Sequence, residues 1–317
     1  MRIVVAGGTG FIGRALCRTL ATTGHQVTVL SRTPSREAKH TRASAAVTVG
    51  WDGAQPGSWE RALEGADAVV NLAGEPIAKA RWSSARKHTL RTSRIGTTRL
   101  LVQAMSRCRN KPGILVNASG IGIYGPCDDQ IVTERSPAGS GFLAELAKDW
   151  EYEALQAAAF GIRVVLPRFG MVLAEDGGAL PRILLPFRLF LGGPIQPGTQ
   201  WVSWIHRQDL IALIHWTLTT PAISGPVNAA SPGAVTMTEF CRTIGQVLQR
   251  PNMLPVPLFA LRFVLGELST LMTTGQRVAP LVAQQTGFVF QYPALRQALE
   301  QIVRAAGPEP MPMRAAG

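Results

Sequence analysis

Cysteine is scarce in this chain of 317 residues, and its four cysteines lie far apart in the sequence. No two of them form a C-x-x-C pair, so the sequence offers neither paired zinc ligands nor the framework of a small disulfide-rich domain. We therefore expect a reduced, cytoplasmic protein that holds no metal ion. The four cysteines are Cys17, Cys108, Cys127 and Cys241.

Long apolar runs are also missing. The most apolar late stretch, residues 253–272, is interrupted by two prolines, an arginine and a glutamate, and is too broken for a membrane-spanning helix. The pattern predicts instead a core helix or a partner-facing helix over residues 258–271. The first apolar strand begins at residue 2, so we expect no signal peptide and no membrane partner.

Acidic residues are outnumbered, with 32 Lys and Arg against 20 Asp and Glu and a net charge of +12. The basic residues are scattered, and no block of five or more consecutive ones occurs. Because aromatic residues do not alternate with them, the pattern argues against a nucleic-acid partner. Part of the positive charge is expected to serve an anionic cofactor or substrate.

The beginning of the chain carries its most informative pattern. An apolar run, Ile3–Ala6, leads into the sequence Gly-Gly-Thr-Gly-Phe-Ile-Gly and then into an apolar-patterned helix. A nucleotide pyrophosphate fits such a turn, because N–H groups at the helix N-terminus point at it and glycines let the main chain approach. The predicted cofactor contacts in this turn are Gly7, Thr9, Gly10, Phe11, Ile12 and Gly13.

Short apolar strands alternate with helices through the first half of the chain, which predicts a parallel sheet covered on both faces. The sequence therefore predicts an α/β fold, a Rossmann-type doubly wound parallel sheet with a smaller C-terminal substrate-side lobe. The expected strands are residues 26–30, 46–49, 68–72, 114–118 and 163–166, and the long helices are residues 84–107 and 142–160.

The texture of the chain changes after Gly170, where glycine and proline become frequent, as in loops and short elements. A helix is expected over residues 237–248, with Thr236 or Thr238 near its cap, and residues 225–229 are expected to return to the sheet. The predicted divisions are an NADP-binding Rossmann domain at 1–170, the lobe with a C-terminal helical region at 171–306, and a disordered tail at 307–317.

The end of the second strand predicts which dinucleotide binds. A carboxylate about 20 residues after the glycines usually bonds the adenosine ribose of NAD, but this strand ends in Leu30-Ser31-Arg32. Ser31 can donate a hydrogen bond, and Arg32 can pair with a 2′-phosphate, with further charge from Arg36 and Lys39. We therefore favour NADP over NAD. The alternative is that Arg32 is simply a surface residue after a strand.

Two further segments border the expected cofactor. Asp52 follows the third strand, where it either approaches the adenine amino group or forms a turn, and the sequence favours neither. Leu72-Ala73-Gly74 follows the fourth strand and is small and apolar, as suits backbone that passes a cofactor. The plainest expectation for Glu75, which comes next, is an exposed loop carboxylate.

Together these segments resemble the extended short-chain dehydrogenase/reductase superfamily, and more specifically its atypical branch of epimerase family proteins with a C-terminal domain of unknown function. The resemblance implies an NADP site lined by the glycine turn and by Ser31, Arg32, Leu72, Ala73 and Arg94. Without it, Arg94 would be read as a helix-surface arginine. The matching segments are Gly7–Gly13, Val29–Arg32, Asn71–Ile77, Arg81-Trp82, Ser93-Arg94, Tyr124–Pro126, Leu184–Arg188, Gly192–Ile195, Trp204–His206 with Asp209, and Gly275–Val278.

Active members of that superfamily use a Tyr-x-x-x-Lys pair, in which the lysine lowers the tyrosine pKa so that the phenol can exchange a proton. None of the three tyrosines here has a lysine four residues later, and Phe142 or Leu143 takes the expected tyrosine position. Ser119 is also expected to lie near the cofactor. For Glu145 and Lys148, the alternative to a role in proton transfer is a surface ion pair. The remaining candidates for proton transfer are Ser119, Tyr124, Glu145 and Lys148.

Three candidate functions follow. The first is an NADP-dependent oxidoreductase or epimerase-like enzyme that acts on an unknown small molecule through an unusual proton donor. The alternative is a sensor or scaffold that binds NADP(H) without turnover, and nucleic-acid binding is a distant third. His206 is expected to be a core or capping histidine, and Trp201 and Trp204 either pack in the core or wall a pocket. The sequence leaves the substrate, the reaction direction and the oligomeric state open.

Overall fold

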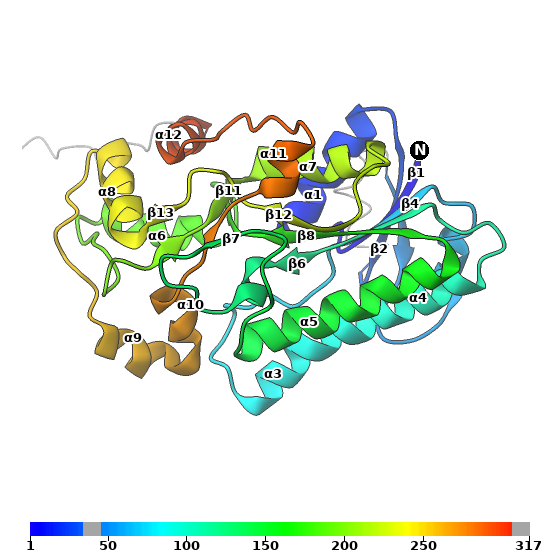
Figure 1. Cartoon of the computed structure of the whole chain (residues 1–317), viewed down its shortest axis with the longest axis horizontal. Coiled ribbons are helices and arrows are strands. Elements are labelled where there is room, and N and C mark those ends of the chain that lie inside the picture. Colours follow the sequence, from blue (N-terminus) through cyan, green and yellow to red (C-terminus); the bar gives the residue numbers. More distant parts are fainter. Residues whose placement is uncertain (34–45, 306–317) are drawn as a thin grey trace, which may run out of the picture.

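A parallel sheet forms the body of the molecule (Figure 1). The structure is a computed structural model and describes residues 1–33 and 46–305. The strand order is β12-β8-β5-β4-β1-β2-β3, with β6 also paired to β8, and each of these pairings is parallel. The predicted Rossmann-type sheet is thus confirmed. Its strands are β1 (Arg2–Ala6), β2 (Gln26–Ser31), β3 (Val47–Gly50), β4 (Ala68–Asn71), β5 (Ile114–Asn117), β6 (Ser119–Gly120), β8 (Arg163–Phe169) and β12 (Gly225–Ala229).

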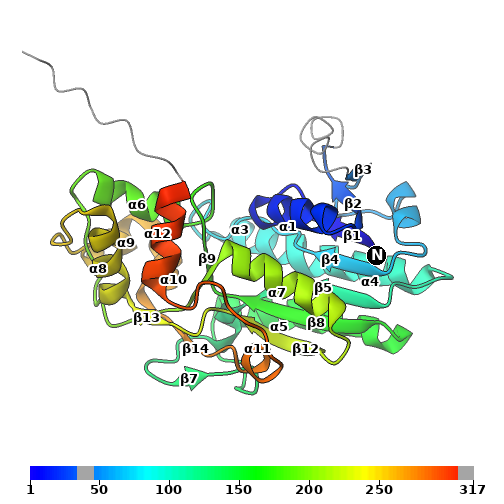
Figure 2. The ribbon, with the colours of Figure 1, turned by 90° about the horizontal axis from the view of Figure 1, so that it is seen from above.

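Both faces of the central part of the sheet are buried, because β1, β4, β5 and β8 are largely apolar, with side chains on alternate faces. Along β1, Ile3 and Val5 contact one helical layer, whereas Val4 and Ala6 contact the other. Figure 2 shows α1 and α7 on one side, and Figure 1 shows α4 and α5 side by side. The bounds are α1 (Phe11–Thr22), α7 (Arg207–Thr219), α4 (Thr97–Arg107) and α5 (Phe142–Leu155).

The helix predicted over residues 84–107 is interrupted in its middle. α3 (Ser84–Arg91) passes into α4 through a π-helical turn at Thr92–Gly96. Such turns are rare and frequently mark functional sites, and this one contains Arg94, which is buried. The other long helix, α5, ends in a 3₁₀ turn over Gln156–Phe160.

The second lobe has its own apolar core. The helix expected over 237–248 is confirmed as α8 (Met237–Leu248), and the Thr236 side chain caps it by accepting a hydrogen bond from the N–H of Glu239 at 3.3 Å. The other helices of this core are α6 (Leu180–Arg188) and α12 (Leu295–Ala305). Short strand pairs are β9 (Met171–Leu173) with β11 (Trp204–His206), β10 (Trp201–Val202) with β13 (Val235–Thr236), and β7 (Ile131–Val132) with β14 (Arg277–Val278).

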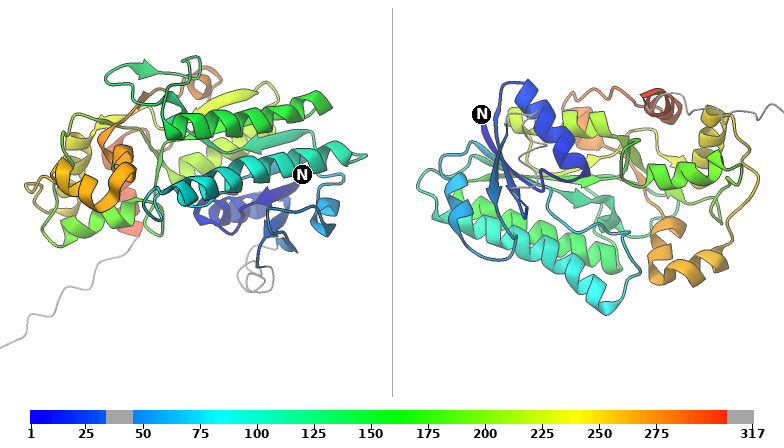
Figure 3. Two further views of the ribbon diagram at one scale, coloured as in Figure 1. Left: turned by 90° about the horizontal axis from the view of Figure 1, so that it is seen from below. Right: turned by 180° about the vertical axis from the view of Figure 1, so that it is seen from behind.

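An exposed helix, α9 (Leu258–Leu265), lies at one end of this lobe and is followed by α10 (Thr270–Thr273) (Figure 3). Phe259 and Phe263, one turn apart, are 77% and 83% exposed. The expectation of a core helix is therefore wrong for this face, and a partner-facing helix stays a prediction. Within residues 1–33 and 46–305, no helix is long and apolar enough to cross a membrane.

The second half of the chain returns to the sheet, as expected for residues 225–229. β12 pairs with β8, and α7 packs beside α1. Because residues 171–306 contribute to both the sheet and the lobe, the division at residue 170 stays a prediction. Arg36, Lys39 and the predicted tail at 307–317 lie outside the described residues.

Candidate cofactor site

The turn after β1 has two positions where only glycine fits. Gly7 has φ +75°, and a Cβ there would lie 2.7 Å from the carbonyl carbon of Leu72. A Cβ on Gly13 would lie 2.2 Å from the carbonyl oxygen of Gly7. Because each added side chain would collide with main chain, glycine is required at both positions for the close packing of the turn against α1 and the loop after β4. The N–H of Gly10 closes the turn by donating to the Gly7 carbonyl at 3.0 Å.

The N-terminus of α1 begins at this turn without a side-chain cap. Its N-cap residue, Gly10, makes no side-chain hydrogen bond, and no acidic residue lies in the first helical turn. Uncapped N–H groups and the positive end of the helix dipole favour a bound anion. The Arg14 guanidinium adds a cation at the turn, where its Nη1 donates to the carbonyl of Thr9 at 2.9 Å. Ile12 packs against the apolar core between α1 and the sheet. The geometry fits a diphosphate.

The second lobe reaches the glycine turn at Phe11. A Cβ on Gly177 would lie 2.5 Å from this ring, and one on Gly178 would lie 3.1 Å from it. Arg207 stacks over the same ring, with Cζ 5.2 Å from the centroid, and pairs with Asp176. The Phe11 ring therefore contacts the second lobe next to the glycine turn, beside the expected cofactor.

The end of β2 carries the predicted pair Ser31 and Arg32. Ser31 is buried, and its Oγ accepts a hydrogen bond from the N–H of Thr33 at 3.2 Å. The side chain of Arg32 is 76% exposed, and its Nη1 lies 3.5 Å from Oε1 of Glu75. Arg32 is thus a surface residue that faces the loop after β4, and its contact with a 2′-phosphate stays a prediction.

Glu75 is not the exposed loop carboxylate that we expected. Its side chain is 19% exposed, and its Oε2 lies 3.4 Å from Nη1 of Arg86 and 3.7 Å from Nζ of Lys79. Burial opposes its charge, but the hydrogen bond from Arg86 and the charges of Lys79 and Arg32 lower the pKa of Glu75 overall. The carboxylate therefore stays ionised among three cations.

Arg94 is buried beside the same loop, with 8% of its surface exposed. A Cβ on Gly74 would lie 3.1 Å from Cζ of Arg94, and the guanidinium lies over Trp150, 5.3 Å from the ring centroid. Burial, together with repulsion from Arg86, lowers the pKa of Arg94 to about 10. The helix-surface reading of Arg94 is therefore wrong, and its guanidinium borders the expected path of the cofactor.

Asp52 forms a turn after β3. Its Oδ1 accepts hydrogen bonds from the N–H groups of Ala54 at 2.8 Å and Gln55 at 3.0 Å. These two bonds lower the pKa of the Asp52 carboxyl. The turn interpretation is confirmed, and the adenine contact stays a prediction.

A buried amide network that the sequence analysis missed holds the loop containing Leu72 and Ala73. Nδ2 of Asn71 donates to Oγ1 of Thr98 at 2.9 Å and to Oδ1 of Asn117 at 2.6 Å. Oδ1 of Asn71 accepts the N–H of Ala73 at 3.1 Å. The available signal was an asparagine at the end of each of two neighbouring apolar strands, β4 and β5.

The candidate proton donors Ser119 and Tyr124 belong to a second network, in which every side chain is buried. Oγ of Ser119 donates to Oε1 of Glu151 at 2.6 Å. Arg168 donates to both Glu151 oxygens, each at 2.8 Å. The Tyr124 hydroxyl accepts from Nη1 of Arg168 at 2.9 Å and donates to Oδ1 of Asn228 at 2.7 Å.

This buried network makes the Tyr124 phenol a poor proton donor. Burial raises the pKa of the Tyr124 phenol, although the Arg168 charge opposes the change. For Arg168 itself burial acts against the charge, but hydrogen bonds to Glu151 hold the guanidinium pKa above its usual value. The sequence analysis missed both members of this ion pair. The available signal for Arg168 was a charged residue within an apolar strand, β8.

The positions of the missing tyrosine and lysine are apolar. Leu143 packs against Gly122, since a Cβ added to Gly122 would lie 3.1 Å from the Cβ of Leu143. Ala147, four residues after Leu143, is buried. Phe142 packs edge-on against Trp82, with 5.2 Å between the ring centroids. The side chains of Phe142, Leu143 and Ala147 therefore have no proton to transfer.

Glu145 and Lys148 form an ion pair at 2.5 Å on the surface of α5, where their side chains are 54% and 40% exposed. The structure confirms that Glu145 and Lys148 form an exposed ion pair. A catalytic role for either residue stays a prediction. Exposed pairs contribute little to stability, because water and salt screen them and ordering the side chains costs entropy.

We expect Glu145→Gln to change the free energy of unfolding by less than about 1 kcal/mol, because the pair is exposed. Urea denaturation followed by circular dichroism measures the change. A loss of several kcal/mol would contradict the surface position of this pair.

His206 caps α7 from a buried position. Its Nδ1 accepts the N–H of Gln208 at 3.2 Å, and its Nε2 lies 2.9 Å from Oε1 of Gln301. Burial lowers the pKa of His206. The expected core or capping histidine is confirmed. Trp204 is fully buried in the core of the second lobe, whereas Trp201 is partly exposed.

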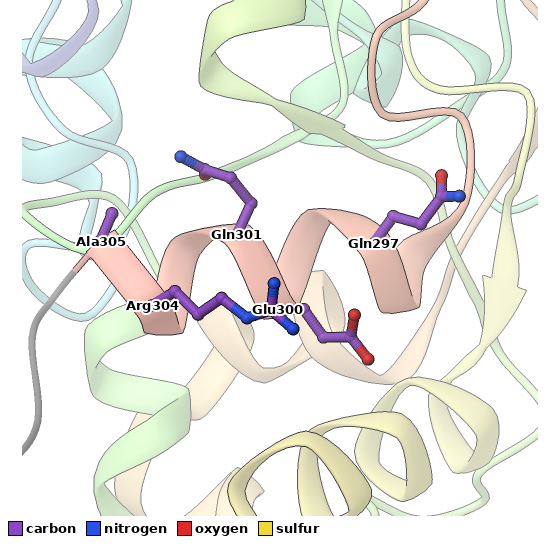
Figure 4. A pocket seen from close by; sticks show the side chains of 5 residues that line it. All are labelled: Gln297, Glu300, Gln301, Arg304 and Ala305. Carbon is purple, nitrogen blue, oxygen red and sulfur yellow. The ribbon is translucent and has the colours of Figure 1, made fainter.

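A shallow hollow runs along α12, and Figure 4 shows the side chains that line it. None of them belongs to the predicted cofactor or catalytic residues, so the hollow adds nothing to the site described above. The lining residues are Gln297, Glu300, Gln301, Arg304 and Ala305.

Known proteins share this sequence and fold over almost the whole chain. The sequence model of the NAD dependent epimerase/dehydratase family matches residues 3–230, and a domain of unknown function matches residues 256–302. The chain is 40% identical over 308 residues to the chloroplastic epimerase family protein SDR39U1 homolog of Arabidopsis thaliana, covering 96% of this chain and 87% of that protein. It is also 40% identical over 306 residues to the epimerase family protein YfhF of Bacillus subtilis, covering 96% and 98%.

A solved structure agrees with these sequence relationships. The crystal structure of the human epimerase family protein SDR39U1, determined with NADPH, superposes with a TM-score of 0.84 at 34% identity, covering 96% of this chain and 99% of that chain. The chain therefore belongs to the NAD dependent epimerase/dehydratase family, in its branch of epimerase family proteins.

Proposed function

We propose that this chain binds NADP(H) and acts as an oxidoreductase or epimerase-like protein on a small molecule. The observation that carries the proposal is the glycine turn at the uncapped N-terminus of α1, next to β2, which is followed by a cation, Arg32, rather than by a carboxylate. The NADPH in the structure of the human relative supports it. A dinucleotide with a 2′-phosphate matches both features.

Different residues of the site would bind different parts of the cofactor. Gly7–Gly13 and the N–H groups of α1 would hold the diphosphate, and Arg32 would pair with the 2′-phosphate. Leu72 and Ala73 would border the adenosine, since the amide network at Asn71 fixes their backbone. A nicotinamide cofactor held by these residues would supply hydride transfer as its chemistry.

A non-catalytic role as an NADP(H) sensor or scaffold is the second candidate. It is favoured by the engagement of Ser119 and Tyr124 with buried partners. Leu143 and Ala147 add to this argument, because they are apolar where active relatives of this fold carry a proton-transfer pair. In the enzyme hypothesis Ser119 is the hydroxyl to test first, since its position at β6 lies at the same edge of the sheet as the glycine turn.

Purified protein should be titrated with NADPH and NADH, then incubated with NADPH and a panel of ketones, enones and nucleotide sugars. Cofactor oxidation that survives controls and falls in Ser119→Ala, but not in Glu153→Gln, supports the enzyme. Tight NADPH binding without turnover supports the sensor. If the protein binds neither NADPH nor NADH, both candidate functions are contradicted.

A further inference from the structure

The loop after β4 carries more positive charge than one carboxylate neutralises. Arg32, Lys79 and Arg86 each lie within 3.7 Å of Glu75. Arg94 is a fourth cation beside the loop, and Glu75 and Arg86 both influence its pKa. Among residues 1–33 and 46–305, the cluster therefore has four cations for one carboxylate.

The backbone and side chains of this loop are fixed in place. The N–H of Glu75 donates to Oγ of Ser93 at 3.2 Å, and Arg86 donates to the carbonyl of Pro76 through Nη2. Nε of Arg86 is buried and lacks a hydrogen-bond partner among the described residues. A buried donor without a partner is costly, so this guanidinium has capacity for a further acceptor.

We propose that Glu75 is a built-in counter-ion for this cluster, and that its charge limits the affinity of the site for the 2′-phosphate of NADP(H). The inference rests on the proposed function, which places that phosphate at Arg32. Without cofactor, the Glu75 carboxylate holds Arg32 and offsets the mutual repulsion of Arg86 and Arg94. With cofactor, the phosphate becomes a competing anion for the same cations.

The two anions compete because like charges near the same cations repel each other, most strongly where water is partly excluded. Removing the carboxylate should therefore have opposite effects on the two states of the protein. The cofactor-free protein loses its counter-ion and becomes less stable. The complex with NADPH loses a repulsion, whereas NADH, which has a 2′-hydroxyl, is indifferent to the change.

The test is Glu75→Gln, studied by isothermal titration with NADPH and with NADH at one low ionic strength, and by thermal unfolding without cofactor. We expect NADPH to bind about tenfold more tightly, which corresponds to about 1.4 kcal/mol. NADH affinity should stay within about twofold, and the unfolding temperature of the cofactor-free protein should fall. Glu153→Gln is the matched control, because it removes a carboxylate paired with Arg99 between α4 and α5, and it should leave NADPH affinity unchanged.

NADPH binding that is unchanged or weaker in Glu75→Gln overturns the inference. Should that variant fail to fold, Glu75→Asp keeps the charge but withdraws it from Arg32, and it should tighten NADPH binding by a smaller factor. Unchanged or weaker NADPH binding in that variant likewise overturns the inference. Equal affinity of the unmodified protein for NADPH and NADH contradicts the proposed function itself. A preference for NADPH that Glu75→Gln does not increase contradicts only the role of Glu75.

Discussion

Arg32→Glu is expected to weaken NADPH binding far more than NADH binding. Loss of a charge-assisted pair with the 2′-phosphate costs about 1.5–3 kcal/mol, or about 10- to 150-fold in affinity. The new carboxylate would also repel the phosphate and lie near Glu75, which is 3.5 Å from Arg32 in the unmodified protein. NADH has no phosphate at this position, so its affinity should change by less than about threefold.

Isothermal titration at fixed salt measures both affinities. Arg242→Glu is the control, because it makes the same charge change at a 61% exposed side chain on α8, and it should preserve the preference for NADPH. Equal losses of NADPH and NADH affinity in Arg32→Glu would show that Arg32 acts on the fold or on the net charge. That result would contradict a 2′-phosphate contact.

Arg168→Met is expected to destabilise the protein by about 3–5 kcal/mol, because it leaves Glu151 buried without its cation. Both side chains of this pair are less than 10% exposed, at 9% and 8%. The same change removes the donor to the Tyr124 hydroxyl. Urea denaturation gives the free energy of unfolding.

The double variant Glu151→Gln with Arg168→Met should lose less stability than the two single losses added together, since it no longer buries an unpaired charge. Arg91→Met is the control, because it breaks a pair with Asp149 in which both side chains are well exposed, at 42% and 45%, and it should cost less than about 1 kcal/mol. A cost below about 1 kcal/mol for Arg168→Met as well would contradict the burial of its pair.

Most of the fold was predictable because local sequence patterns indicate most of its helices and strands. The start and end of α8 follow from a capping threonine and apolar spacing, both of which lie within the helix and its flank. β12 was expected over residues 225–229, although its place beside β8 depends on the order of the whole sheet. The π turn around Arg94 was not predictable, because the apolar spacing of residues 84–107 suits a continuous helix.

The site was predictable where one segment makes it and unpredictable where side chains from distant segments meet. The glycine turn needs only Gly7 and Gly13 and the strand and helix around them. The surroundings of Glu75 depend on Arg32, 43 residues earlier, and on Arg86, 11 residues later. No periodicity encodes such pairings, so an exposed carboxylate was the natural but mistaken expectation.

A crystal structure of the protein grown with saturating NADPH would show directly where the dinucleotide binds. We expect the diphosphate to lie against the main chain of Gly7–Gly13 and the 2′-phosphate to lie beside the guanidinium of Arg32. A glycine turn that stays empty, or is covered by side chains, in such a crystal would contradict this expectation.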